Sequence, residues 1–261
     1  MQPSSVRKKL NQGELAISAK CAYVDPELVE LVGHFGFDGI WICLEHKRID
    51  PAAIYAMVAA CRLSGADAIL RVPPANYGDL IWLLEAGVRG VMIPRVRHVD
   101  EARKIVEMVK FPPVGRRGFD GVHAEADFGR LAMPEYAAEA NRESFIIIQI
   151  EEPEAVAHID AIAALPGVDV LFVGPADLTL GLGKFGQLED PEVAGIIRQV
   201  AAACKKHGKV AGIPCLASQV AKYRELGFRF LNVVSDYRCM QIGLKQAMAE
   251  LETQGVRLTA R

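Results

Sequence analysis

Apolar residues follow two alternating patterns along the chain, and together they predict parallel strands joined by helices. Short apolar runs rich in β-branched residues have the length of strands that are buried on both faces. Longer segments with apolar residues three and four positions apart are typical of helices, and one of them is followed by Gly65. The predicted strands are residues 15–21, 39–44, 68–72, 90–96, 146–150, 170–173, 209–215 and 229–234. The predicted helices are residues 26–35, 50–63, 77–86, 99–110, 218–226 and 237–253, with a crossover helix between residues 152 and 170.

Eight such strand–helix units in one chain favour an α/β fold, the TIM (β/α)8 barrel, over an open doubly wound sheet. The length of 261 residues is typical of one barrel. No linker or shift in composition divides the chain, so residues 1–261 are expected to form a single domain. Residues 111–128 interrupt the pattern with Pro, Gly and Arg, and we expect a long loop there at the active end of the barrel.

Composition excludes several classes of function. A net charge of −2 provides no basic surface for nucleic acid, so we expect no nucleic-acid partner. No apolar run reaches the roughly 18 residues that would span a bilayer, and residues 1–11 lack the apolar stretch of a signal peptide. The cysteines form no Cys-x-x-Cys motif, which indicates buried free thiols and a cytoplasmic location.

Ionisable residues are concentrated where the predicted strands end. The carboxyl ends of all the strands of a TIM barrel meet at one rim, which carries the chemistry. Glu151 follows the fifth predicted strand and Asp177 follows the sixth, so the two carboxylates are expected to lie close together. Such paired oxygen ligands suit a hard divalent cation. The other residues expected at the rim are Lys20, Glu45, His46, Arg71, Arg95, Ser235 and Asp236.

Each of these residues also has an ordinary structural interpretation. Glu151 could be a solvated acid at a strand end, and Asp177 could cap a helix. Arg71 could form a structural ion pair. A lone histidine is usually structural, but the rim position of His46 favours a role in proton transfer, because imidazole titrates near neutral pH.

Five groups of residues stand in an informative order along the chain. They are Gly36-Phe37-Asp38 with Glu45-His46, Gly90-Val91-Met92-Ile93-Pro94, Gly115-Arg116-Arg117-Gly118, Gln149-Ile150-Glu151 and Gly174-Pro175-Ala176-Asp177-Leu178. This ordered set resembles that of the HpcH/HpaI family of class II pyruvate aldolases, from about residue 10 to the C-terminus. The resemblance implies a lyase that reversibly cleaves a 4-hydroxy-2-oxo acid into pyruvate, or hydroxypyruvate, and an aldehyde through a metal-bound enolate. It also implies Mg²⁺, Mn²⁺ or Co²⁺ as the cofactor and a homohexamer built as a trimer of dimers, with the helix 237–253 used in subunit packing.

The resemblance also implies roles for individual residues. Glu151 and Asp177 would bind the cation, which would act as a Lewis acid on the C2 carbonyl oxygen. Arg71 would bond that oxygen as it gains charge. The turn that binds the pyruvate carboxylate through its backbone N–H groups would consist of Gly174, Pro175, Ala176 and Asp177.

Proton transfer would fall to His46. The resemblance implies that a carboxylate orients this histidine, and the matching residue is Glu85, where relatives often carry Asp. Glu85 could equally be an ordinary solvated acid of a helix. Glu45 would hold water molecules bound to the metal.

Two positions depart from the family pattern: relatives often carry Asp in place of Cys43 and an aromatic residue in place of Lys20. Lys20 would either favour an aldehyde with an anionic group or be solvated, and Cys43 could simply be packed in the core. Arg116 and Arg117 would reach a substrate carboxylate or a neighbouring active site, or else lie on the surface. Three other functions stay open: a metal-free aldolase with a Schiff base on Lys20, a lyase for CoA thioesters of the citrate or malyl-CoA lyase type, and a non-catalytic barrel that binds a metal or a keto acid.

Overall fold

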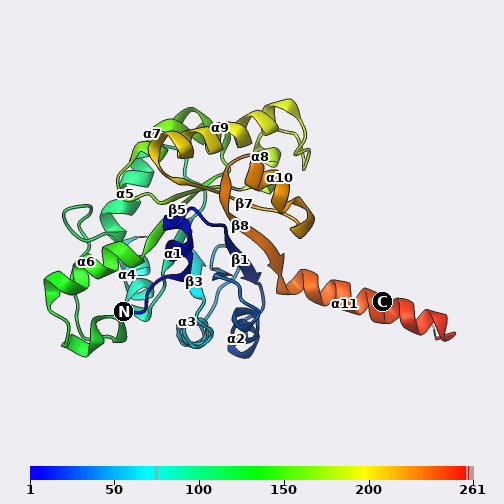
Figure 1. Ribbon diagram of the computed structural model, residues 1–261, viewed down its shortest axis with the longest axis horizontal. Helices are drawn as coiled ribbons and strands as arrows, with labels where there is room; N and C mark the ends of the chain where they lie inside the picture. Colours follow the sequence, from blue (N-terminus) through cyan, green and yellow to red (C-terminus); the bar gives the residue numbers. More distant parts are fainter. Residues whose placement is uncertain (74–75, 257, 259–261) are drawn as a thin grey trace.

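The computed structural model describes residues 1–73, 76–256 and 258, and its strands form a closed parallel barrel (Figure 1). Each strand pairs with the next in the chain, and β1 closes the ring against β8. The strands are β1 Ala16–Cys21, β2 Gly39–Cys43, β3 Asp67–Arg71, β4 Gly90–Ile93, β5 Phe145–Ile150, β6 Val170–Val173, β7 Val210–Pro214 and β8 Phe228–Ser235. The predicted TIM barrel is confirmed. The fourth strand is shorter than predicted, because Pro94 has no N–H to donate and Arg95 adopts a left-handed φ of 62°.

Helices surround the barrel, and most begin at a side-chain cap. The oxygens of Asp25, Asp50, Asn76 and Asp190 accept hydrogen bonds from N–H groups of the first turns of α2, α3, α4 and α9. The α-helices are α1 Ser5–Asn11, α2 Pro26–His34, α3 Pro51–Ser64, α4 Tyr77–Ala86, α5 Val99–Val109, α6 Met133–Glu143, α7 Ile159–Ala164, α8 Pro175–Gly181, α9 Pro191–His207, α10 Val220–Glu225 and α11 Asp236–Thr253. The 3-10 helices are η1 Ala124–Gly129, η2 Pro153–His158 and η3 Ala217–Gln219.

Besides the short α8 and the 3-10 helices, three α-helices of the described chain lie in segments for which no helix was predicted. α1 and α6 are rich in charged residues and bury few side chains, so their apolar periodicity is weak. α9, in contrast, buries Val193, Ile196, Ile197 and Val200 at helical spacing. The same periodicity could therefore have identified α9 from the sequence.

The inward-facing side chains change from apolar to polar toward the carboxyl ends of the strands. Trp41, Phe172 and Phe230 fill the middle of the barrel, and neighbouring ring centroids of this group are 5.9 Å apart. Because successive residues of a strand face opposite sides, the next inward position of β2 is Cys43. The inward residues at this upper level include Lys20, Cys43, Arg71 and Gln149.

α1 closes the amino-terminal end of the barrel and lies in front of the strands in Figure 1. Val6 is fully buried and packs in the interior cluster. Asp67, at the start of β3, accepts hydrogen bonds from Ser4 Oγ at 2.5 Å and from the N–H of Val6 at 2.9 Å. This end is therefore sealed by the chain itself.

The irregular segment after α5 begins away from the carboxyl ends of the strands. Helices of the barrel run antiparallel to the strands, so α5 ends near the amino-terminal end and the segment starts there. Arg117 is buried, donates to Tyr136 Oη at 3.1 Å and lies over the ring of Phe111, whereas Arg116 is exposed. Residues 111–128 line no part of the cavity at the carboxyl ends within this chain, although the N–H of Gly118 donates to Tyr77 Oη at the start of α4 at 2.8 Å. The prediction of a loop at the active end stays a prediction.

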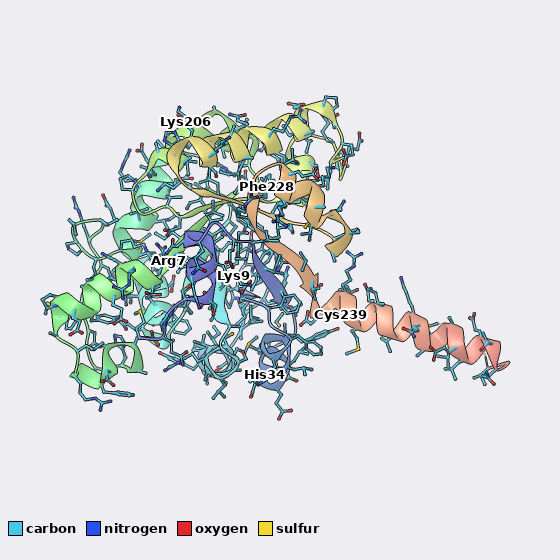
Figure 2. All side chains as sticks on the ribbon, viewed as in Figure 1. Arg7, Lys9, His34, Lys206, Phe228 and Cys239 are labelled. Atoms are coloured by element: carbon cyan, nitrogen blue, oxygen red, sulfur yellow. The ribbon has the colours of Figure 1, made fainter. Side chains whose placement is uncertain are left out.

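α11 extends away from the barrel (Figures 1 and 2). Cys239, labelled on this helix in Figure 2, is exposed, as are the apolar residues Tyr237, Met240, Ile242, Leu244, Met248 and Leu251. In the described part of the chain, no helix is both long and apolar enough to cross a membrane. The use of α11 in subunit packing stays a prediction.

Candidate active site

A cavity of about 610 Å³ opens at the carboxyl ends of the strands. Side chains from β1, β2, β3, β5, β6, β7 and β8 line it, together with the first turns of α8 and α11. The predicted site residues in its lining are Lys20, His46, Arg71, Glu151, Gly174, Pro175, Ala176 and Asp177. Most of the predicted site residues thus line one cavity.

Glu151 is buried directly after β5 and has only one of its two oxygens satisfied. Its Oε1 accepts a hydrogen bond from the N–H of Arg95 at 2.8 Å, and its Oε2 has no partner among the described residues. A Cβ on Gly174 would lie 2.3 Å from Oε2, so this carboxylate packs against the turn only because residue 174 is a glycine. Burial raises the pKa of Glu151 to about 7, and the negative charge of Asp177 contributes in the same direction.

Asp177 lies in the first turn of α8, which follows Gly174, and its side chain is more exposed than that of Glu151. The helix cap itself is Gly174, and Asp177 is not the capping residue. Asp177 lines the same cavity as Glu151, and its negative charge acts on that carboxylate.

Arg95 connects the two acids and was not predicted to have a role beyond its place at the rim. Its left-handed φ of 62° accompanies the bond from its N–H to Glu151. Its guanidinium lies 2.8 Å from Glu152 Oε1 and 3.9 Å from Asp177 Oδ1. Nothing in the residue pattern marks a left-handed conformation at an arginine, so this positioning role is visible only in the structure.

Arg71 is held from several sides at the end of β3. Its Nε lies 3.1 Å from Glu45 Oε2, and its Nη2 lies 3.1 Å from Cys43 Sγ. Its Nη1 lies 3.4 Å from Gln149 Oε1, and its guanidinium carbon lies 5.0 Å from the centroid of Trp41. The predicted ion pair exists, and it fixes a buried guanidinium that also faces the cavity.

His46 is mostly exposed, and its nearest acid is Glu45. Its Nε2 lies 3.6 Å from Glu45 Oε2, the same oxygen that contacts Arg71. Glu45 thus connects the candidate proton-transfer residue with the guanidinium.

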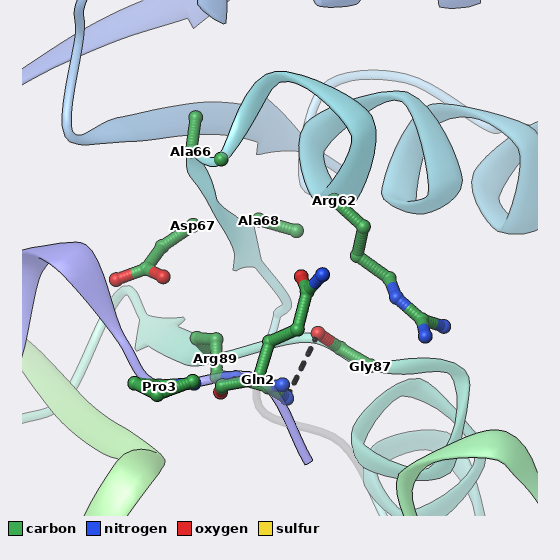
Figure 3. A pocket seen from close by; sticks show the side chains of 9 residues that line it. Gln2, Pro3, Arg62, Ala66, Asp67, Ala68, Gly87 and Arg89 are labelled. Atoms are coloured by element: carbon green, nitrogen blue, oxygen red, sulfur yellow. Dashed lines mark hydrogen bonds between the residues drawn. The ribbon is translucent and has the colours of Figure 1, made fainter.

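Glu85 does not lie with His46 within the chain. It is in the last turn of α4, and barrel helices end at the amino-terminal side. Gly87, which follows this helix, lines a separate cavity of about 230 Å³ with Asp67 and Arg89 at that side (Figure 3). The residue pattern could not reveal which end of the barrel the last turn of α4 reaches, and the role of Glu85 stays a prediction.

Comparison with known proteins identifies the family. A model of the HpcH/HpaI aldolase/citrate lyase family matches residues 22–240. The chain belongs to this family. A 5-keto-4-deoxy-D-glucarate aldolase from Klebsiella pneumoniae is 33% identical over 235 residues, which cover 90% of this chain and 91% of the relative. A 2-dehydro-3,6-dideoxy-6-sulfogluconate aldolase from Pseudomonas putida is 34% identical over 227 residues, which cover 85% and 87%.

Solved structures agree with this assignment. The crystal structure of an HpcH/HpaI aldolase from Desulfitobacterium hafniense matches with a TM-score of 0.89 and 30% identity, covering 94% of this chain and 96% of that one. The resemblance to HpcH/HpaI aldolases is therefore confirmed, and the protein is a lyase of this aldolase family.

The acids of this HpcH/HpaI protein fit a divalent cation. Glu151 and Asp177 are hard oxygen donors, and the buried Oε2 of Glu151 lacks a partner. Within residues 1–73, 76–256 and 258, no cluster of three or more His, Cys, Asp or Glu side chains is arranged for a metal. Two protein ligands would leave the other coordination positions to substrate and water.

Proposed function

We propose that this protein is a divalent-metal-dependent aldolase that reversibly cleaves a 4-hydroxy-2-oxo acid into pyruvate, or hydroxypyruvate, and an aldehyde. The observation that carries the proposal is the buried Glu151, whose free oxygen lies beside Asp177 in the same cavity as a fixed Arg71. The two relatives are named as aldolases of a keto-deoxy glucarate and a dehydro-dideoxy sulfogluconate, which supports a 2-oxo sugar acid as the substrate class.

The bond between C3 and C4 breaks when C3 can keep the electron pair, which requires the neighbouring C2 oxygen to accept charge. A divalent cation bound by Glu151 and Asp177 would supply Lewis acidity at that oxygen, with Mg²⁺, Mn²⁺ and Co²⁺ as the ions to test. Arg71 donates a charged hydrogen bond to the same oxygen. Its contacts with Glu45 and Cys43 hold it in place before the charge develops, so little reorganisation is needed.

The substrate carboxylate binds at the turn that opens α8. Pro175 has no N–H, and the N–H groups of Ala176 and Asp177 lie in the first turn of the helix, where no carbonyl of the same helix can accept them. An anionic group in the cavity can accept these donors.

During cleavage His46 takes the proton from the C4 hydroxyl as the aldehyde forms, and C3 gains a proton from solvent to complete pyruvate. Condensation reverses both transfers. Its position at the mouth of the cavity and its contact with Glu45 support this role. Glu85 has no part in this scheme within one chain.

The assembly and location belong to the same proposal. The exposed apolar residues of α11 support packing of this helix against another subunit, in a homohexamer built as a trimer of dimers. The enzyme acts in the cytoplasm on small 2-oxo acids and aldehydes.

The test is an aldol assay with pyruvate and a panel of aldehydes, after removal of metal with EDTA and after addition of each ion. We expect EDTA to abolish both condensation and exchange of the pyruvate methyl protons into deuterated water, and Mg²⁺, Mn²⁺ or Co²⁺ to restore both. Activity that resists EDTA but is lost with borohydride and pyruvate would favour a Schiff base on Lys20. Turnover of CoA thioesters alone would favour a thioester lyase, and pyruvate binding without proton exchange would favour a non-catalytic barrel.

A further inference from the structure

The cavity has charges of opposite sign on opposite walls. Its acids, Glu151 and Asp177, follow β5 and β6, whereas Lys20 ends β1 and Arg238 lies in the first turn of α11, directly after β8. In a ring of eight strands, β1 and β5 stand opposite each other. Lys20 pairs in register with Ser235, so the two cations belong to one seam of the barrel.

Lys20 is held in the cavity without an acidic partner. Its Nζ lies 4.8 Å from the centroid of Trp41, and it makes no hydrogen bond or ion pair with any residue that the structure describes. The guanidinium of Arg71 lies 5.0 Å from the same ring. Burial lowers the pKa of Lys20, and the positive charge of Arg71 contributes in the same direction. An anion placed beside Lys20 would therefore favour its charged form and offset the repulsion from Arg71.

The residues around this wall leave Lys20 and Arg238 available to bind an anion. Oδ2 of Asp236 accepts the N–H groups of Ala22 and Tyr23 at 2.7 and 2.8 Å, and this carboxylate forms no ion pair with Lys20, although its negative charge favours the charged form of Lys20. Asn232 donates to Ser18. Arg238 lines the cavity and forms no ion pair in the described part of the chain.

From this arrangement we propose that Lys20 and Arg238 form a second anion-binding subsite, which holds a terminal anionic group of the aldehyde. The subsite rests on the proposed function, because it assigns the 2-oxo acid end of the substrate to the wall of Glu151 and Asp177. It makes the preferred substrate a molecule with an acidic group at each end. Lys20 thereby acts as a specificity residue and takes no part in the covalent chemistry.

The experiment compares aldehydes that differ only in a terminal charge. The matched pairs are glyoxylate with acetaldehyde and 4-oxobutanoate with butanal, each condensed with pyruvate by the metal-loaded enzyme. We expect the anionic aldehyde of at least one pair to have a kcat/KM about 100-fold above its neutral partner, as for a charge-assisted hydrogen bond. Lys20→Met and Arg238→Met should each lower this ratio about tenfold or more, and Lys20→Arg should retain most of it.

Lys47→Met is the matched control, because Lys47 lies on the same rim, donates to the carbonyl oxygen of Ala22 and does not line the cavity. We expect it to leave the ratio unchanged. Ratios near one in both pairs, or a ratio that Lys20→Met does not lower, would overturn the subsite. Exchange of pyruvate methyl protons by the same wild-type sample reports separately on the proposed function.

A binding measurement tests the subsite even without turnover. Trp82→Phe leaves Trp41, beneath Lys20, as the remaining tryptophan of the chain. In this background and without metal, 4-oxobutanoate should change the fluorescence of Trp41 at concentrations at which butanal does not. Adding Lys20→Met should weaken the binding about tenfold or more, whereas equal responses to the two aldehydes would contradict the proposal.

Discussion

Both ends of the barrel bury charged side chains, but the partners of these side chains differ between the two ends. At the amino-terminal end, Asp67 accepts from Ser4 Oγ at 2.5 Å, and Arg89 lies 2.6 Å from Glu125 Oε2. At the carboxyl end, one oxygen of Glu151 has no partner, and Lys20 has none among the described residues. Each end also has a cavity, of about 230 Å³ and about 610 Å³ respectively.

The difference shows that a hollow with charged walls does not by itself mark an active site. Figure 3 shows the guanidinium of Arg89 bonded to the carbonyl of Gly87, and its Nε also donates to the carbonyl oxygen of Gln2 at 3.1 Å. These are intramolecular hydrogen bonds to backbone carbonyl groups, so they stabilise the fold. At the other end, Glu151 forms no ion pair with any residue that the structure describes, and its buried Oε2 can still bind a cation.

The largest effect expected from breaking the carboxyl end is the loss of metal-supported catalysis in Asp177→Ala. The variant removes one of two protein oxygens proposed to bind the cation, so we expect aldol turnover to fall by about 10³-fold or more. Because Asp177 is partly exposed, its unfolding free energy should change by less than about 1 kcal/mol. Turnover assays with and without Mn²⁺ and thermal unfolding of the same sample measure the two quantities. Full Mn²⁺-stimulated turnover in this variant would remove Asp177 from the site.

Arg89→Met should produce the reverse result at the amino-terminal end. Glu125 would keep a buried charge without its close partner, and breaking such a pair costs about 3–5 kcal/mol of unfolding free energy. Denaturant unfolding measures this loss, and the folded fraction should keep its kcat because Arg89 does not line the large cavity. Arg103→Met is the matched control, since Arg103 forms an exposed pair with Asp100 and should change stability by less than about 1 kcal/mol. A stability of Arg89→Met equal to that of the control would mean that the amino-terminal pair does not stabilise the fold.

The contrast between the two ends also explains what the sequence could predict. The local residue pattern shows where each strand ends. Because the carboxyl ends of all strands share one rim in a closed parallel barrel, Glu151, Asp177 and Arg71 could be grouped from the sequence alone. Glu85 lies away from His46 within the chain because it is in the last turn of α4, and the residue pattern did not show which end of the barrel that turn reaches. Arg95 was expected at the rim, but its contacts with Glu151 and Asp177 were missed because its left-handed backbone leaves no pattern in the residue types. Whether a charge is satisfied depends on long-range contacts such as Ser4 with Asp67, which no local pattern reports.

The smallest expected effect is a pH dependence of cation binding, which should involve the buried carboxyl group at the carboxyl end and not the one at the amino-terminal end. Burial raises the pKa of Glu151 to about 7, and burial also raises that of Asp67 to about 6. A cation binds the carboxylate form, so below about pH 7 it must displace a proton from Glu151. We therefore expect the affinity for Mn²⁺ to fall by up to about tenfold per pH unit below pH 7, and to level off above it.

Calorimetric titration of Mn²⁺ in two buffers of different ionisation enthalpy counts the protons released. About one proton should leave per ion at pH 6, in excess of the number at pH 8. Asp67→Asn removes the other raised carboxyl but leaves the carboxyl-end cavity intact, so its proton release should equal that of the wild type. Release that does not depend on pH, or that disappears in Asp67→Asn, would show that the cation does not bind at Glu151. The orphaned oxygen would then have to be explained by something other than a metal.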